Sequence, residues 1–392
     1  MPDLKEIYLD AASTTPPNQE VIDLVSDIQK NNWANPSNIY SSGIKSAELL
    51  ERSRFRIAEL FEAQPDDVIF TSGATESINL AILSTAMASS PSQIVLSSVE
   101  HPAVISVSEV LRRLGWNVLF WPVDRYGNIR IDRLEEYLQP PTKIVSLIWG
   151  QSEIGTIQPI ELIGKECKKR QITMHTDASQ YIPHGPISWR NLSVDYLSAS
   201  AHKFRGPRGI GLLLKKSNRE LPFFPIFAGG KQEQGYRGGT PSVDLIAGMS
   251  LALDLVYSNF DHKDSYSNRK SVRSMTNQLR KKLSLIDNVY FTGDPYNRLS
   301  NHISMLISNK YNKPVLTNKL VKALSNKGIY LSSGTACSTL SNSPSHVLKS
   351  INVDPKYYNS GLRLTLGNWI TPKDIENIPK LIHETIDQIG NG

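Results

Sequence analysis

The sequence predicts an α/β protein with a large domain, built on a mostly parallel sheet between helices, and a smaller α+β domain at the C-terminal end. Three observations predict this fold. The chain has 392 residues, more than the about 250–300 residues that a single hydrophobic core usually serves. Short apolar runs alternate with amphipathic helical patterns over the first part, which is typical of parallel sheets covered by helices. After residue 242 this alternation gives way to longer polar and charged segments.

Seven short apolar runs are the expected strands of the large sheet. They are VIFT at 68–71, QIVLSS at 93–98, NVLFWPV at 117–123, KIVSLIW at 143–149, QITMHTD at 171–177, DYLSAS at 195–200 and IGLLL at 210–214. Helical patterns lie between several of them, at residues 76–86, 103–114 and 160–170. We therefore expect a seven-stranded, mostly parallel sheet with helices on both faces.

The rest of the chain predicts a smaller α+β domain. A helical pattern at 245–257 is followed by a polar stretch and then by a long charged helical pattern that ends at residue 285. The expected strands of this domain are VYFTG at 289–293, HISMLIS at 302–308, GIYLSS at 328–333 and GLRLTLG at 361–367. We place residues 15–260 in the large domain, and residues 1–14 and 261–392 in the small domain.

Composition narrows the class of protein. No apolar run approaches the roughly 18 residues that a membrane span needs, and the N-terminus lacks the features of a secretory signal, so we expect a cytoplasmic protein that is not bound to a membrane. The net charge is +6, and the lysine and arginine residues are scattered among 37 acidic residues without forming a basic block. This pattern favours acidic protein partners over direct binding of nucleic acid. The two cysteines, Cys167 and Cys337, are too far apart in sequence for a disulfide framework or a CxxC metal site.

Lys203 lies in the stretch SASAHKFRGPRGIG, at the end of an expected strand and before a turn rich in glycine and proline. A lysine taken alone is usually a solvated surface residue. Here, however, the strand should end at the edge of the sheet where open α/β proteins bind ligands. We therefore interpret Lys203 as a candidate functional residue.

Three other stretches end expected strands and could meet Lys203 in one crevice. The stretch TSGATESIN, at 71–79, has small residues before a helix. The free backbone N–H groups there are either an anion site or part of an ordinary helix N-cap. Asp177 is the last residue of an expected strand, where an acid either caps the segment that follows or pairs with a buried cation. His101 precedes a helix, and a histidine in such a position usually caps the helix or belongs to the core. Together, an amine, a carboxylate and an anion site match the chemistry of pyridoxal 5′-phosphate (PLP), which requires no metal.

In this order, the motifs resemble the group I cysteine desulfurases, a group within the class V aminotransferase branch of fold-type I PLP enzymes. The resemblance covers almost the whole chain. It rests on YLDAASTTPP, NPSNIYSSG, TSGATESINLAI, HTDASQ, SASAHKFRGPRGIG, RGGTPSV, SSGTACSTLSNSPSHVL and GLRLTLG. It implies fold type I, PLP as cofactor, L-cysteine as substrate and a homodimer. The implied reaction converts L-cysteine to L-alanine and passes the sulfur through an enzyme persulfide to an acceptor protein.

The resemblance implies three catalytic side chains. Lys203 would form a Schiff base with PLP, and His101 would stack on the cofactor ring and move protons. Cys337 would attack the substrate sulfur, and its small polar loop suits a nucleophile better than a buried apolar cysteine. A thiol with a pKa of ~8.5 is only partly ionised at neutral pH, so a nearby base must help. Cys167, in an amphipathic helical pattern, is expected to be structural or a surface residue.

The resemblance also implies a set of binding residues. The cofactor phosphate would be held by Ala74, Thr75, Ser200, His202 and, from the second subunit, Thr240. Asp177 would face the pyridine nitrogen of PLP and Gln180 its phenolic oxygen. Asn35 and Arg363 would bind the substrate, whose carboxylate a guanidinium can clamp in a bidentate manner.

Two positions depart from the family pattern. This chain reads WGQSEIG where the family has an asparagine pair before EIG, so Ser152 replaces the side chain that contacts the phenolic oxygen. Tyr40 replaces a histidine. A selenocysteine lyase, another class V PLP enzyme, or a weakly active homologue that mainly assists assembly therefore stays an alternative. The sulfur acceptor also stays open: an iron–sulfur scaffold, a tRNA-thiolation relay or a DNA sulfur-modification system.

Overall fold

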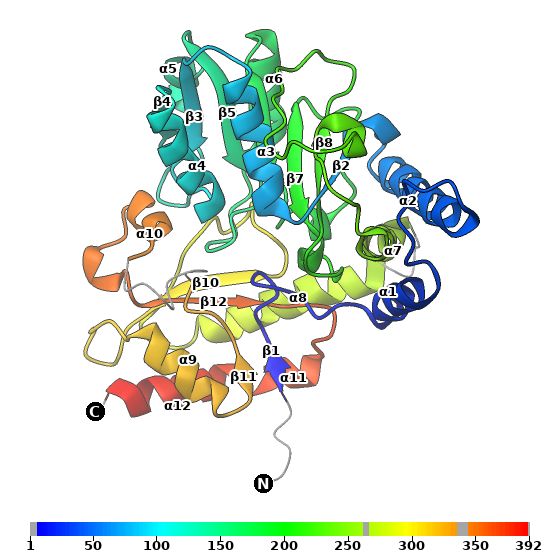
Figure 1. Cartoon of the computed structure of the whole chain (residues 1–392). Helices are drawn as coiled ribbons and strands as arrows, with labels where there is room; N and C mark the ends of the chain where they lie inside the picture. The colour runs from blue at the N-terminus through cyan, green and yellow to red at the C-terminus, as the bar shows by residue number, and fades with distance from the viewer. Residues whose placement is uncertain (1–5, 262–265, 335–343, 391–392) are drawn as a thin grey trace.

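The chain folds into a larger part, in the upper half of Figure 1, and a smaller part below it. The structure is a computed structural model that describes residues 6–261, 266–334 and 344–390. Cys337 therefore lies outside the described residues. The first and last described residues, 6 and 390, both lie at the smaller part.

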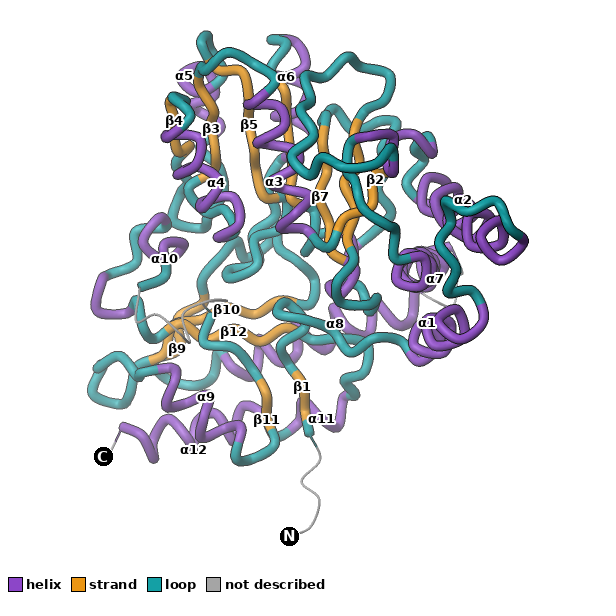
Figure 2. The backbone as a smooth tube through the Cα atoms, viewed as in Figure 1, coloured by secondary structure: helices purple, strands orange, loops and turns teal. Residues whose placement is uncertain are grey.

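A seven-stranded sheet forms the centre of the larger part, in the order β2-β8-β7-β6-β5-β3-β4. Its strands are β2 (Val68–Thr71), β3 (Gln93–Ser97), β4 (Asn117–Trp121), β5 (Thr142–Ile148), β6 (Thr173–Asp177), β7 (Tyr196–Ser200) and β8 (Gly211–Lys215). β8 runs antiparallel to both of its neighbours, and the other neighbouring pairs are parallel. The predicted number of strands and their mostly parallel order are confirmed. Figure 2 shows strands of this sheet side by side in the larger part.

The central strands of this sheet are buried over most of their length, because helices cover both faces of the sheet. In β3, Ile94 belongs to a hydrophobic cluster with Ile78 and Val104, whereas Val95 belongs to a second cluster with Ile163. Successive strand side chains point to opposite faces, so both faces need apolar residues. The helices of the larger part are α1 (Gln19–Asn31), α2 (Ser41–Leu60), α3 (Ala74–Met87), α4 (Pro102–Arg113), α5 (Leu134–Tyr137), α6 (Ile160–Lys169) and α7 (Val243–Asp261).

The smaller part has a three-stranded antiparallel sheet and a short parallel strand pair, as an α+β domain should. Its strands are β1 (Ile7–Tyr8), β9 (Val289–Phe291), β10 (His302–Ile307), β11 (Ile329–Tyr330) and β12 (Gly361–Thr365). Its helices are α8 (Tyr266–Leu283), α9 (Thr317–Ser325), α11 (Pro372–Glu376) and α12 (Ile378–Gly390). Leu9 packs in the apolar cluster of this smaller part, so the N-terminal end of the described chain belongs to the smaller part.

One short helix of the C-terminal region packs on the larger part instead. Val347 and Leu348 of α10 (His346–Ser350) belong to the main apolar cluster of the large sheet. The predicted domain boundary after residue 260 lies near the end of α7, and we keep it as a proposal. None of the helices in the described ranges is both long and apolar enough to cross a membrane.

Candidate active site

A cavity of about 590 Å³ opens where the central parallel strands end, between the large sheet and the N-terminal turn at residues 12–14. The sequence-predicted residues that line it are Ala74, Thr75, His101, Ser152, Asp177, Gln180, Ser200, His202, Lys203 and Arg363. Two predicted binding residues lie elsewhere in the same chain. Asn35 and Thr240 line a separate cavity of about 250 Å³.

The strand order explains why distant residues meet here. Asp177 and Ser200 are the last residues of the neighbouring parallel strands β6 and β7, so both reach the same edge of the sheet. Gly211, at the start of β8, lets the turn before α3 lie close to that edge. A Cβ atom at Gly211 would lie 2.6 Å from the Cα atom of Gly73 and 2.6 Å from the carbonyl oxygen of Ala199, so a larger residue would push this turn away.

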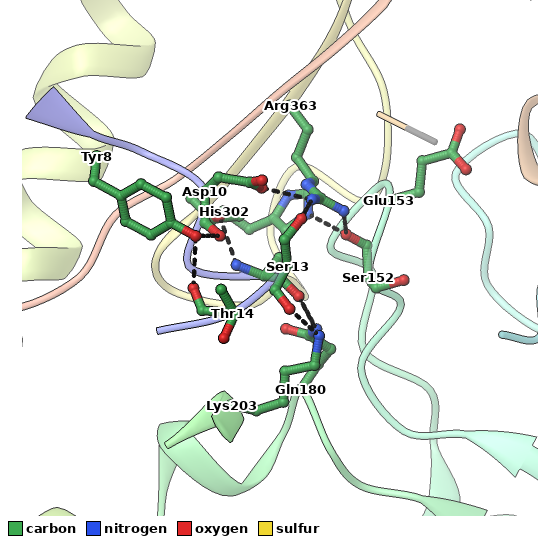
Figure 3. A network of polar contacts seen from close by, with 12 residues as sticks. Tyr8, Asp10, Ser13, Thr14, Ser152, Glu153, Gln180, Lys203, His302 and Arg363 are labelled. Carbon is green, nitrogen blue, oxygen red and sulfur yellow. Dashed lines mark hydrogen bonds and ion pairs between the residues drawn. The ribbon is translucent and has the colours of Figure 1, made fainter. Parts of the chain in front are cut away.

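Lys203 points at the N-terminal turn. Its Nζ atom donates to the carbonyl oxygens of Ala12 at 2.6 Å and Ser13 at 2.8 Å (Figure 3). Burial, together with the positive charge of Arg363, lowers the pKa of Lys203 to about 8, although Asp177 and Asp10 act in the opposite direction. A lowered pKa increases the fraction of uncharged amine near neutral pH, and the uncharged amine is the nucleophile.

The first turn of α3 and residues after β7 lie together in the cavity wall and offer groups that could hold an anion. The N–H group of Ser77 bonds to the carbonyl of Gly73, so the N–H groups of the residues before Ser77 have no place in the helical ladder. His202 lies nearby, and its Nδ1 atom is 3.0 Å from the hydroxyl of Thr14. Burial, with the charges of Lys203 and Arg208, lowers the pKa of His202 to about 4. A neutral ring can still hydrogen-bond an anion.

His101 both caps a helix and lines the cavity. Its Nδ1 atom accepts the N–H of Ala103 at 3.1 Å, at the N-terminus of α4. Because Nδ1 is the acceptor, the proton of the neutral ring is on Nε2. Burial lowers the pKa of His101, and Lys203 and His346 act in the same direction, against Asp177. The capping and functional interpretations of His101 are therefore compatible.

Arg363 is buried, at 1% exposure, beside the cavity. Its Nη2 atom donates to Asp10 Oδ1 at 2.6 Å and to Ser13 Oγ at 2.9 Å, and its Nη1 atom donates to the carbonyl oxygen of Ser152 at 3.0 Å (Figure 3). Its Nε atom is buried and has no hydrogen-bond partner within the described ranges. The guanidinium is thus held in place by Asp10, Ser13 and Ser152 at the wall of the cavity.

The two residues before the EIG motif have different roles in the fold. Gln151 is buried, and its Oε1 atom accepts the N–H groups of Glu153 and Ile154, while its Nε2 atom donates to the carbonyl of Val99 at 3.2 Å. Ser152 lines the cavity instead. The side chain of Gln151 is therefore bonded within the fold, and Ser152 is the one of the two that faces the cavity.

Sequence reasoning missed the contribution of the N-terminal turn. The carbonyl of Ala12 accepts hydrogen bonds from Lys203 and, at 2.7 Å, from Gln180 Nε2. Tyr8 fixes the turn, since its hydroxyl donates to the carbonyl of Thr14 at 2.9 Å and lies 3.1 Å from the carbonyl oxygen of Asp10. Backbone acceptors leave no side-chain pattern, and the run of small residues AASTT was the only available signal.

These groups fit PLP. The helix N-terminus with Ser200 and His202 matches a phosphate group, and the buried carboxylate of Asp177 matches a protonated ring nitrogen. Lys203, with its lowered pKa, matches the lysine that carries the cofactor. Arg363 lines the cavity, and a guanidinium there can bind a carboxylate.

Comparison with known proteins agrees with this chemistry. The family model for class-V aminotransferases matches residues 7–378. The chain belongs to this family. The cysteine desulfurase IscS of Dictyoglomus turgidum is 36% identical, over 98% of this chain and 95% of its own length. Among solved structures, a NifS-like protein has a TM-score of 0.88 at 28% identity, covering 97% of this chain and 98% of its own. SspA in complex with cysteine has a TM-score of 0.77 at 30% identity, covering 92% and 98%.

Within the class-V aminotransferase family, the chain is a PLP-dependent enzyme of the cysteine desulfurase group. The predicted family, fold type I architecture and cofactor are confirmed. The roles of individual residues stay predictions.

Proposed function

We propose that this enzyme takes the sulfur from L-cysteine, releases L-alanine and holds the sulfur as a persulfide on Cys337 for an acceptor protein. One observation carries the proposal: Lys203, Asp177, the N-terminus of α3 and Arg363 surround one cavity in a chain of the desulfurase group. A cavity lined by these groups, with PLP bound, can hold an amino acid by its carboxylate and its amine together.

The residues of the cavity divide the chemistry among them. PLP held in this cavity would supply an electron sink for the α-carbon of the substrate once the substrate amine has replaced Lys203 on it. Asp177 holds the proton on the ring nitrogen, and the Arg363 guanidinium orients the substrate carboxylate. Lys203 Nζ takes the α-proton of the substrate, and its lowered pKa suits a base at neutral pH. His101 carries a proton on Nε2 and can pass it to or from the reacting groups.

Cys337 completes the reaction in this proposal. Its thiolate forms a bond to the substrate sulfur while the Cβ–S bond of the substrate breaks, and the former Cβ carbon is protonated as alanine is formed. The described residues that follow Cys337 in the sequence contact the segment that carries His101. His346 Nε2 donates to the carbonyl of Glu100, the residue before His101, at 2.8 Å, and Ser350 Oγ donates to the carbonyl of Ser98 at 2.7 Å.

A homodimer is part of the proposal. Asn35 and Thr240 lie outside the cavity of their own chain, so a second copy is needed if they are to bind substrate and cofactor. Apolar side chains around them are exposed: Trp33 is 78% exposed, Ile39 92% and Phe227 48%. Large exposed apolar side chains close in sequence to Asn35 are consistent with a surface that a partner buries. We further propose a cytoplasmic enzyme whose acceptor is an iron–sulfur scaffold or a sulfur-carrier protein.

The proposal is tested with purified enzyme, PLP, L-cysteine and a thiol reductant. We expect alanine and sulfide to form in equal amounts. Absence of alanine under these conditions would overturn the proposal.

Arg363→Ala is expected to raise the KM for L-cysteine about ten-fold or more, because a hydrogen bond to a charged group contributes about 1.5–3 kcal/mol. The spectrum of the bound cofactor should change little. Steady-state kinetics measures the effect. Because Asp10 also loses its partner, thermal unfolding of the same variant shows whether the fold is intact, and Arg363→Lys separates the charge from the bidentate geometry. An unchanged KM would remove Arg363 from the substrate site.

Ser152→Asn is expected to change the absorption spectrum of the bound cofactor or to raise turnover. The longer amide side chain can donate a hydrogen bond to the phenolic oxygen, where charge is redistributed during the reaction. Gln151 cannot substitute for it, since its side chain is bonded at both ends. Spectra and turnover numbers identical to those of the wild type would show that Ser152 already fulfils this role.

A further inference from the structure

Glu76 is a carboxylate at the helix N-terminus that we propose as the phosphate site. It is the third residue of α3, it is largely buried, and it lines the same cavity as Thr75 and Lys203. Its Oε2 atom accepts the N–H of Ser72 at 2.7 Å. A carboxylate in the first turn stabilises the helix itself. It also repels any second anion bound at the same turn, because two negative charges then share one site.

Glu76 forms an ion pair with a residue far along the chain. Arg237 Nε lies 2.9 Å from Glu76 Oε1, and the two side chains are 26% and 7% exposed. Burial acts to raise the pKa of Glu76, but the hydrogen bonds from Arg237 and Ser72 outweigh it and hold the pKa below its ordinary value. Glu76 is therefore ionised, and Arg237 supplies the compensating charge next to the cavity.

The segment that carries Arg237 is anchored by a second, buried ion pair. Arg54 Nη2 lies 2.8 Å from Glu233 Oε1, and these side chains are 8% and 4% exposed. Glu233 Oε2 also accepts the N–H of Phe70 at 2.8 Å, and Arg54 Nη1 donates to the carbonyl of Val68 at 2.7 Å.

Phe70 and Val68 belong to β2, the edge strand of the sheet. The ion pair of Arg54 and Glu233 thus occupies backbone groups of β2 that a neighbouring strand would otherwise bond. This anchoring holds the segment that follows Glu233 against the sheet. Arg237 therefore reaches α3 from a fixed position.

We propose that Arg237 is a positioning residue for the cofactor phosphate: by pairing with Glu76 it neutralises a carboxylate that would otherwise repel the phosphate from the N-terminus of α3. This inference rests on the proposed phosphate site. The same segment continues to Thr240, so one anchored stretch serves the phosphate site of its own chain and presents a residue to a second copy. A simple structural brace between Arg237 and Glu76 is the competing explanation.

The test compares the binding of PLP and of pyridoxal, which lacks the phosphate, to the cofactor-free enzyme. In Arg237→Gln, Glu76 keeps its charge without a partner. We expect the Kd for PLP to rise about ten-fold, or about 1.4 kcal/mol, while the Kd for pyridoxal changes less than about two-fold. Absorbance titration measures both constants, and inorganic phosphate as a competitor gives a readout that does not need the lysine.

Removing both charges distinguishes two explanations: repulsion between Glu76 and the phosphate, and a purely structural role of the Glu76–Arg237 ion pair. The single and double variants form a double-mutant cycle. Glu76→Gln/Arg237→Gln should bind PLP within about two-fold of the wild type, and Glu76→Gln alone should bind it at least as tightly as the wild type. Arg56→Gln is the matched control, since Arg56 pairs with Glu59 and Asp254 and does not line the cavity. Its PLP affinity should be unchanged.

The outcomes are distinct. If the double variant binds PLP as weakly as Arg237→Gln, the pair is a brace and the inference is wrong. An equal loss of affinity for pyridoxal also overturns it, because the effect is then not on the phosphate. If the wild type itself binds neither compound, the proposed cofactor site fails as well.

Discussion

Lys203→Ala should purify without the visible absorption band of lysine-bound PLP, and its turnover of L-cysteine should fall by roughly three orders of magnitude or more. Lys203 lines the cavity, and its lowered pKa of about 8 makes its amine a nucleophile near neutral pH. Alanine cannot form the covalent link to the cofactor or take the α-proton of the substrate. Absorbance spectra before and after addition of PLP, together with an alanine assay, measure both losses.

Lys165→Ala is the control for this experiment. Lys165 is an exposed residue that pairs with Glu161 on α6, and its loss should leave the spectrum and the turnover unchanged. If Lys203→Ala still shows the band of the wild type, another lysine carries the cofactor and the site is wrong.

Cys337→Ser should separate substrate binding from sulfur transfer. Binding of PLP and L-cysteine needs Lys203, Asp177 and Arg363 but no thiol, so L-cysteine should still change the cofactor spectrum. Sulfur transfer needs a polarisable thiolate, which a serine hydroxyl does not provide. Formation of alanine and sulfide should therefore fall to background in the assay that tests the wild type.

Cys167→Ser is the matched control. Cys167 is fully buried in the main apolar cluster, and burial, assisted by Asp195, raises the pKa of its thiol to about 12. An inert thiol is expected there, so this variant should keep near wild-type activity. A selenocysteine lyase would instead keep its activity on selenocysteine after Cys337→Ser, and a protein that only assists assembly would show no difference between the two variants.

Much of the large sheet could be predicted from the sequence because strands buried on both faces leave continuous apolar runs. Residues 68–71, for example, form β2 as predicted. The helices α1 and α2 precede the predicted strands and were not predicted. The short connection from Lys203 to Gly211 places β8 antiparallel to β7, since a parallel neighbour would need a long crossover.

The candidate site was harder to predict because its geometry depends on backbone atoms and on tertiary contacts. The carbonyls of Ala12 and Ser13 have no sequence signature, yet both accept hydrogen bonds from Lys203. The pairing of Arg363 with Asp10 joins residues 353 positions apart, which no local pattern indicates. Asn35 and Thr240 lie in a separate cavity of their chain, so their predicted roles depend on a second copy.

Peptide mass spectrometry is the most direct test of whether Cys337 takes the sulfur atom from the substrate. The wild-type enzyme with PLP is treated with L-cysteine, alkylated without reduction and digested. We expect one extra sulfur atom on the peptide that contains Cys337 and none on the peptide that contains Cys167. Extra sulfur on Cys167 alone, or none on either peptide while alanine is formed, would contradict it.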